Sequence, residues 1–256
     1  GGPTMFALSS LPACIVLFCL TMGVAQAGIV INGTRQIYPE PRREITVQVT
    51  NDDASAPRLV QVWMDGGDPQ AAAEHSEVPF SISPPVFRVD PGKSQAIRLA
   101  YTREPLPTDR ESVFWLNVLE VPPSGAGAQA DANQMRFAFR IRTKVFFRPQ
   151  DLPGTAHDAA DQLQWRVLAG RPALLRVHNP TPYYVTFHEV ALVTGAGQMP
   201  TEHQGMVAPH ASLDLALPGT LSELPSGAQV QFQYINDFGG FSAPRQASFN
   251  DSHLKP

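Results

Sequence analysis

Short runs in which apolar and polar residues alternate recur along most of the chain. A period of two places successive side chains on opposite faces of a β-strand, whereas an amphipathic helix repeats every 3.6 residues. Helical periodicity is almost absent, so the pattern predicts a protein built of strands. The predicted strands cover residues 44–50, 58–63, 86–89, 95–101, 112–121, 163–168, 173–179, 183–192, 213–217 and 229–236.

Turns rich in proline and glycine separate these runs, as in "DPGK" at 90–93. Many short strands joined by such turns are typical of antiparallel β-sandwiches. The pattern stops at "RPQDLPG", residues 148–154, and then restarts. The full length of 256 residues also suits more than one domain. We therefore expect an all-β protein of two sandwich domains, one over residues 28–149 and one over residues 150–256.

The clearest alternation lies in "NQMRFAFRIRTKVFFRP", residues 133–149. Four apolar side chains point to one face of this predicted strand: Met135, Phe137, Phe139 and Ile141. Four cations point to the other face: Arg136, Arg140, Arg142 and Lys144. Taken alone, this is the pattern of a half-buried strand whose charged face is solvated.

The N-terminal segment contains no charged side chain before Arg35. Its apolar run, residues 11–27, ends in Ala25-Gln26-Ala27, a small-residue cleavage pattern. We predict a signal peptide over residues 1–27 and a mature chain that begins at Gly28. The alternative is an uncleaved membrane anchor, which Pro12 and the polar residues within the run disfavour.

Removal of the signal peptide would also remove Cys14 and Cys19, the two cysteines of the chain. The exported protein would then contain neither a structural disulfide nor a zinc site built from cysteine.

Sequence signatures of catalysis and of cofactor binding are absent. The seven histidines do not have the spacing of metal ligands, and no G-x-S-x-G nucleophile elbow occurs. No phosphate-binding P-loop is present, so nucleotide binding is not expected. The formal net charge of −4 gives no support to nucleic-acid binding. We therefore expect no enzymatic activity, no metal and no cofactor.

Five segments carry a resemblance to a known family. They are "GTRQIYP" (33–39), "DRESVFWLNVLEVPP" (109–123), "RTKVFFRPQDLPG" (142–154), "HNPTPYYVTF" (178–187) and "YINDFGGFSAP" (234–244). Together they resemble the periplasmic pilus-assembly chaperones of the chaperone–usher pathway. The segments have the family's order and extend over both predicted domains.

The resemblance implies two immunoglobulin-like sandwiches set at an angle, with a cleft between them. It implies a periplasmic chaperone that binds fimbrial subunits, which lack the last strand of their own sandwich. The chaperone lends an edge strand to the subunit, which is a form of β-augmentation. It then delivers the subunit to an outer-membrane usher without using nucleotide. An exposed apolar edge also makes self-association of the free protein possible.

The resemblance assigns roles to individual residues. Arg35 and Lys144 match two cleft cations that bind the C-terminal carboxylate of the subunit. Three residues match an interdomain salt bridge: Arg148, with Glu120 and Asp237 as its partners. The groove-filling positions of the donor strand are Met135, Phe137 and Phe139, and Ile141 either extends this row or packs within the chaperone. Two donor positions are Phe where the family often has aliphatic residues, which suggests a subunit with wide pockets.

Two other functions compete with this hypothesis. A structural or adhesive fimbrial subunit would usually be a single incomplete sandwich with a cysteine pair, and the predicted mature chain has neither feature. An exported carbohydrate-active enzyme would need a pair of catalytic carboxylates, which the sequence does not reveal.

Overall fold

The structure is a computed structural model that describes residues 1–2, 28–75, 77–121 and 138–250. Residues 3–27 of the predicted signal peptide, with both cysteines, lie outside the described residues, and so do Met135 and Phe137. Within the described ranges, no helix has the length and apolar character needed to cross a membrane.

The N-terminal half folds as two sheets packed face to face. One sheet has the strand order β1-β3-β7-β5 and the other the order β2-β9-β8-β4-β6. Every pairing between these strands is antiparallel except that of β2 with β9. The strands are β1 (Ile29–Ile31), β2 (Arg35–Pro39), β3 (Ile45–Asn51), β4 (Arg58–Asp65), β5 (Phe80–Ser83), β6 (Val86–Val89), β7 (Ser94–Tyr101), β8 (Ser112–Val121) and β9 (Arg140–Arg148), and a 3-10 turn, η1, covers Ala73–His75.

The C-terminal half repeats this architecture. One sheet has the order β10-β11-β15, and the other has the order β13-β12-β16-β17 with β14 also paired to β12. Its elements are α1 (Ala156–Ala159), η2 (Ala160–Gln162), β10 (Gln164–Leu168), β11 (Leu174–His178), β12 (Val185–Thr194), β13 (Gly197–Pro200), β14 (Met206–Val207), β15 (Ser212–Ala216), β16 (Gln229–Tyr234) and β17 (Arg245–Ala247).

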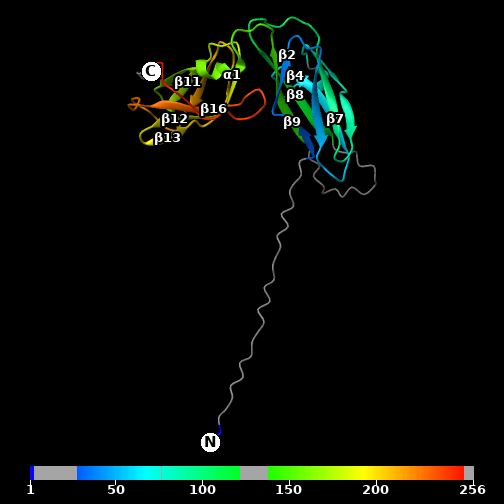
Figure 1. Ribbon diagram of the computed structural model, residues 1–256, viewed down its shortest axis with the longest axis horizontal. Helices are drawn as coiled ribbons and strands as arrows, with labels where there is room; N and C mark the ends of the chain where they lie inside the picture. Colours follow the sequence, from blue (N-terminus) through cyan, green and yellow to red (C-terminus); the bar gives the residue numbers. More distant parts are fainter. Residues whose placement is uncertain (3–27, 76, 122–137, 251–256) are drawn as a thin grey trace.

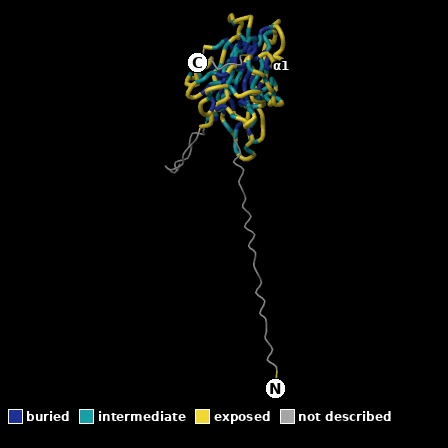
Figure 2. The backbone as a smooth tube through the Cα atoms, turned by 90° about the vertical axis from the view of Figure 1, so that its left-hand side faces the viewer, coloured by how far each residue is buried: buried dark blue, intermediate teal, exposed yellow. Residues whose placement is uncertain are grey.

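Each half buries its own core between its two sheets. The alternating residues of β3 and β7 face the N-terminal core, where Val47, Val49, Ile97 and Leu99 are almost inaccessible to solvent. The C-terminal core is built around Trp165, which packs against the ring of Phe232 at 5.3 Å. Figure 2 shows the buried segments in the middle of the molecule and the exposed ones at its periphery. The predicted all-β fold with two sandwich domains is confirmed.

The alternation in the sequence did not predict the short strands β1, β2, β5, β13, β14 and β17. Strands of two to five residues show too little alternation to be recognised by their period. Helix α1 is also too short for a periodic signal, and it begins where the Thr155 side chain accepts a hydrogen bond from the Asp158 N–H.

The two halves lie beside each other at an angle (Figure 1). The sheet that contains β2 and β9 faces the C-terminal half, while β7 lies on the far side of the N-terminal half. The loop that follows β16 extends toward the N-terminal half, and its Gly239 carbonyl accepts a hydrogen bond from the Thr34 hydroxyl at 3.4 Å. This loop and the start of β2 therefore bound the space between the domains.

Candidate functional site: the cleft between the domains

Arg35 and Lys144 lie side by side in the cleft, as direct partners in the parallel pairing of β2 with β9. Arg35 is the first residue of β2, and its Cζ lies 5.0 Å from the centroid of the Phe146 ring. The Arg35 Nε is buried without a hydrogen-bond partner. For Lys144, the described part of the chain provides neither a hydrogen-bond acceptor nor an ion-pair partner. The fold thus brings together two cations whose charges are not compensated at close range.

The electrostatics of this pair favour an anion. Burial and the neighbouring Arg35 charge lower the pKa of Lys144 to about 8. Burial also lowers the pKa of Arg35, although Asp237 and Glu111 partly oppose this effect. A carboxylate bound between the two groups would raise the pKa of both, because an opposite charge within hydrogen-bond distance stabilises the protonated forms.

Strand β9 has one unoccupied edge next to these cations. Its other edge pairs with β8 along its length, from Arg140 opposite Leu119 to Phe147 opposite Ser112. Strand β2 joins only from Lys144 onward, so within the described residues no strand covers the second edge of residues 140–143. This edge leaves backbone groups available to an added strand, and it ends where Arg35 and Lys144 begin.

Two of the predicted donor side chains are described. Phe139 is 64% exposed, just before β9 begins. Ile141 is partly buried and packs against the N-terminal core, so of the two alternatives for this residue the structure favours packing within the chain. The odd-numbered side chains of β9 form one face, and this face leaves the core as it passes from Val145 to Phe139.

The charged face of β9 is not simply solvated, which corrects the expectation from its alternation. Arg142 forms a two-point ion pair with Asp65, at 2.6 Å and 3.0 Å, and stacks at 4.6 Å over Trp115. Asp65 also accepts hydrogen bonds from the Asn117 side chain and the Gly67 N–H. Arg140 donates to the Pro69 carbonyl at 2.7 Å. The cations therefore bind β9 to the end of β4 and to the loop that follows it.

A salt bridge joins the two domains beside the cleft. The Arg148 guanidinium donates to both carboxylate oxygens of Asp237, at 2.8 Å and 2.9 Å. Its Nε donates to Glu111 at 2.9 Å, and Glu111 also accepts from the Tyr184 N–H at 2.8 Å. Although the site is buried, these bonds raise the pKa of Arg148. Burial raises the pKa of Glu111 despite the opposing effect of Arg148.

The prediction that Glu120 takes part in this salt bridge is wrong. Glu120 forms an ion pair with Arg58, and its N–H donates to the Phe139 carbonyl at 2.9 Å. Because β8 and β9 are antiparallel, the start of β8 lies beside the end of β9. Glu120 lies nine residues away from Glu111, about 30 Å along the strand. The antiparallel order of two consecutive predicted strands was the signal that could have identified Glu111.

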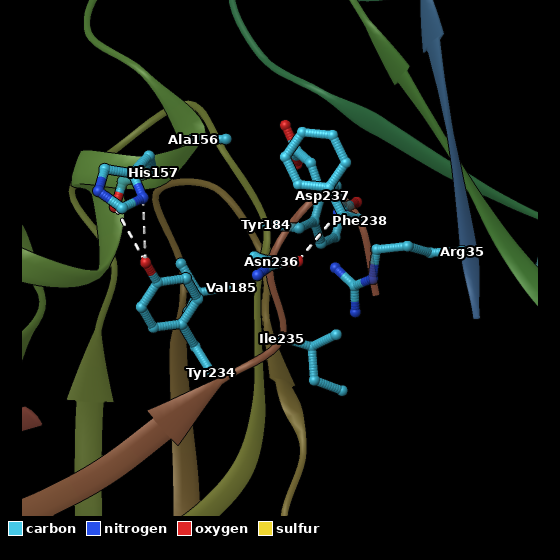
Figure 3. Close-up of a pocket in the computed structure, with 10 residues that line it drawn as sticks. All are labelled: Arg35, Ala156, His157, Tyr184, Val185, Tyr234, Ile235, Asn236, Asp237 and Phe238. Carbon is cyan, nitrogen blue, oxygen red and sulfur yellow. Dashed lines mark hydrogen bonds between the residues drawn. The ribbon is translucent and has the colours of Figure 1, made fainter. Parts of the chain in front are cut away.

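A small pocket of about 90 Å³ lies between Arg35 and the C-terminal domain. Figure 3 shows Arg35 reaching toward the residues that follow β16. Its C-terminal wall includes the apolar side chains of Val185, Ile235 and Phe238 and the ring of Tyr184. The size is well below the ~300–1,000 Å³ of typical small-molecule sites, so the pocket fits a side chain or a chain end better than a metabolite.

Across the described ranges, no cluster of histidine, cysteine or carboxylate side chains is arranged to hold a metal ion. The chemistry that the cleft can perform is recognition: two cations for a carboxylate, a free strand edge for backbone pairing, and an apolar wall.

The chain matches two family descriptions in order. Residues 28–153 match "Pili and flagellar-assembly chaperone, PapD N-terminal domain", and residues 158–246 match "Pili assembly chaperone PapD, C-terminal domain". A relative from Bordetella pertussis, "Chaperone protein FimB/FhaD", is 41% identical over 231 residues, which are 89% of this chain and 90% of the relative.

Solved structures show the same fold. The CupB2 chaperone of Pseudomonas aeruginosa is 38% identical, with a TM-score of 0.72 over 86% of this chain and 100% of that structure. The SafB chaperone of Salmonella enterica, solved in complex with the SafA pilin, is 31% identical, with a TM-score of 0.69 over 86% of this chain and 95% of that one.

Proposed function

Because the chain belongs to the PapD-like family of pilus-assembly chaperones, we propose that it holds a fimbrial subunit by strand donation from β9 and by a carboxylate clamp of Arg35 and Lys144. The family is one of chaperones, which is not a class of enzymes. The comparisons favour the chaperone over the alternative of a fimbrial subunit.

The observation that carries this proposal is the shared position of the free edge and the two cations. A subunit strand paired along residues 139–143, with its carboxylate at Lys144, would run in the same direction as β9. It would end where β2 begins, because Arg35 is the direct partner of Lys144 on that side of β9. The bound strand would thus extend the row that β2 occupies, in parallel pairing with β9.

The clamp would set the register of the added strand. Each charge-assisted hydrogen bond to the carboxylate contributes about 1.5–3 kcal/mol when it is shielded from water. A shift of the subunit by one residue would break these bonds and turn its side chains to the opposite faces. The donor row of Met135, Phe137 and Phe139 would fill the groove that the subunit leaves open.

We further propose that the chaperone works in the periplasm and passes its subunit to an outer-membrane usher. The apolar run before Gly28 supports export, and the periplasm is where the family's substrates would need protection. N-terminal sequencing of the protein released by osmotic shock should start at Gly28. Recovery of an uncleaved chain in the membrane fraction would contradict this part of the proposal.

Purification of the chaperone from periplasm tests the central function. The wild-type chain should recover fimbrial subunits in one-to-one complexes, whereas a structural subunit would recover polymers. Arg35→Ala and Lys144→Ala should give folded, exported proteins that hold no subunit. If both variants recover as much subunit as the wild type, the clamp lies elsewhere. The same preparation, analysed without subunit, measures whether the free protein self-associates.

The carboxylate itself can be tested with a peptide that carries the C-terminal sequence of the recovered subunit. Amidation of this peptide should weaken its binding to the wild-type chain and barely change its binding to the Lys144→Met variant. An equal loss in both proteins would show that Lys144 does not bind the carboxylate.

A further inference from the structure

Phe238 is the most exposed large apolar side chain among the described residues, with 94% of its surface accessible. It lines the pocket that also contains Arg35 (Figure 3). Single exposed apolar side chains are common on protein surfaces, but aromatic residues are enriched among those that form the core of protein–protein interfaces. The exposed Phe238 ring is therefore placed where it could contact a ligand bound at Arg35.

The loop that carries Phe238 is held firmly in place. The Asn236 side-chain oxygen accepts hydrogen bonds from the N–H groups of Phe238 and Gly240, both at 3.0 Å. The Asn236 and Gly239 N–H groups donate to the Gly240 and Asn236 carbonyls, each at 2.9 Å. The residue before Phe238, Asp237, forms an ion pair with Arg148 of the N-terminal domain. These hydrogen bonds fix the backbone position from which the Phe238 side chain projects.

The loop tip also packs against the residue that precedes Arg35. Gly239 has a φ of +81°, and a Cβ added there would collide with the Thr34 hydroxyl. Only glycine fits both the backbone conformation and this close approach. The contact couples the backbone of the Phe238 loop to the start of β2, so this loop and Arg35 line the same pocket.

We propose that Phe238 is a subunit-contact residue that packs against an apolar side chain among the last residues of the bound fimbrial subunit. This inference rests on the proposed carboxylate clamp. If the terminal carboxylate of the subunit is bound by Arg35 and Lys144, the one or two residues that precede it lie about 3–7 Å from the carboxylate along the strand. The neighbouring pocket is lined on its C-terminal side by Val185, Ile235 and Tyr184, so it suits an apolar side chain. The C-terminal domain thereby contributes to specificity.

The test compares two exposed phenylalanines of the same loop region. Phe241 is 59% exposed, but it stacks on His188 at 3.6 Å and does not line the pocket. Phe238→Ala should weaken binding of the co-purified subunit about tenfold or more, mainly through faster dissociation. Phe241→Ala should leave the affinity within about twofold of wild type, and neither variant should change the melting temperature by more than a degree or two, since both rings are largely exposed.

A double-mutant cycle identifies the partner side chain. Each of the last three apolar side chains of the subunit is truncated to Ala and measured against wild-type and Phe238→Ala chaperone. At least one truncation should cost about fivefold less in the Phe238→Ala background than in the wild type. Equal costs in both backgrounds, or equal losses for Phe238→Ala and Phe241→Ala, would overturn the proposal.

Failure of this inference is distinct from failure of the proposed function. If Arg35→Ala abolishes subunit binding while Phe238→Ala binds as well as wild type, the clamp stands and Phe238 has no part in it. If Arg35→Ala binds normally, the clamp itself is wrong, and the inference about Phe238 falls with it.

Discussion

Lys144 combines burial, a lowered pKa and the close positive charge of Arg35. Such a residue lowers the folding stability of the unliganded protein, because a charge that loses its hydration without gaining a partner is unfavourable in the folded state. Lys144→Met keeps the length and the apolar stem of the side chain and removes the charge. We expect this variant to melt at a higher temperature than wild type at pH 7 and to bind the subunit much more weakly. Differential scanning fluorimetry and co-purification measure the two effects.

The gain in stability should also depend on pH. The pKa of Lys144 falls from 10.5 in the unfolded chain to about 8 in the folded chain, so the folded state binds fewer protons between these values. The contribution of Lys144 to stability therefore rises as the pH increases through this window. The difference in melting temperature between Lys144→Met and wild type should shrink above pH 8. A difference that stays constant up to pH 10 would contradict the assignment of this pKa.

Subunit binding should show the opposite dependence on pH. A bound carboxylate raises the pKa of Lys144 above its value of about 8 in the free protein. Below pH 8 the ammonium is already charged and affinity is constant. Above pH 8, binding requires uptake of a proton, so affinity should fall by up to about tenfold per pH unit. Titrations between pH 6.5 and 9.5 test this, with Lys144→Met as the variant whose weaker residual affinity should not change over this range.

At the scale of elements, β9 serves two structures at once. Its C-terminal part completes the N-terminal core with Val145 and Phe147, while Phe139, just before the strand begins, is largely exposed. Phe139→Ala should therefore change the stability of the free chaperone by less than about 1 kcal/mol, as for other exposed positions. Subunit affinity should fall roughly 10- to 100-fold, since a buried Phe contributes about 1.5–3 kcal/mol. Urea unfolding together with subunit dissociation rates separates these effects. A large loss of stability with unchanged affinity would show that Phe139 is an ordinary core residue.

The Arg142–Asp65 pair supports the same strand from its outer face. The Asp65 side chain is 1% exposed, and although burial would raise its pKa, the bonds from Arg142 and Asn117 lower it. Arg142→Ala leaves a buried carboxylate without its ion-pair partner, which should cost about 3–5 kcal/mol of unfolding free energy. The exposed pair of Arg88 and Asp90 is a matched control, for which Arg88→Ala should cost less than about 1 kcal/mol. Comparable losses for the two variants in urea unfolding would show that Arg142 is not the anchor of β9.

At the scale of the whole molecule, the two cores are separate and the domains meet through few groups. Arg148→Ala removes the bonds to both Asp237 and Glu111, so the interdomain angle should vary more widely while each domain stays folded. Small-angle X-ray scattering should report a larger radius of gyration and a broader distance distribution. Glu111→Gln should shift the scattering in the same direction. Glu120→Gln is the control that should leave the scattering unchanged, because Glu120 binds Arg58 within the N-terminal domain.

Some features of this protein follow from the sequence alone. The period of two is a local property of the chain, so the strands at 86–89 and 112–121 were predicted with the bounds that the structure has. The motif segments assigned Arg35, Lys144, Arg148 and Asp237 to the region between the domains. Local pattern and family motif sufficed here because each depends on residues that are close together in the sequence.

Other features depend on which strands become neighbours, and only the tertiary structure decided them. Glu111 rather than Glu120 meets Arg148, because antiparallel pairing reverses the direction of β8 relative to β9. Arg142 is paired with a buried aspartate because β4 ends two strands away from it on the same face. The free edge beside Lys144 exists because β2 starts only at Arg35. Such relations join residues far apart in the chain, and the alternation within one strand carries no information about its neighbours.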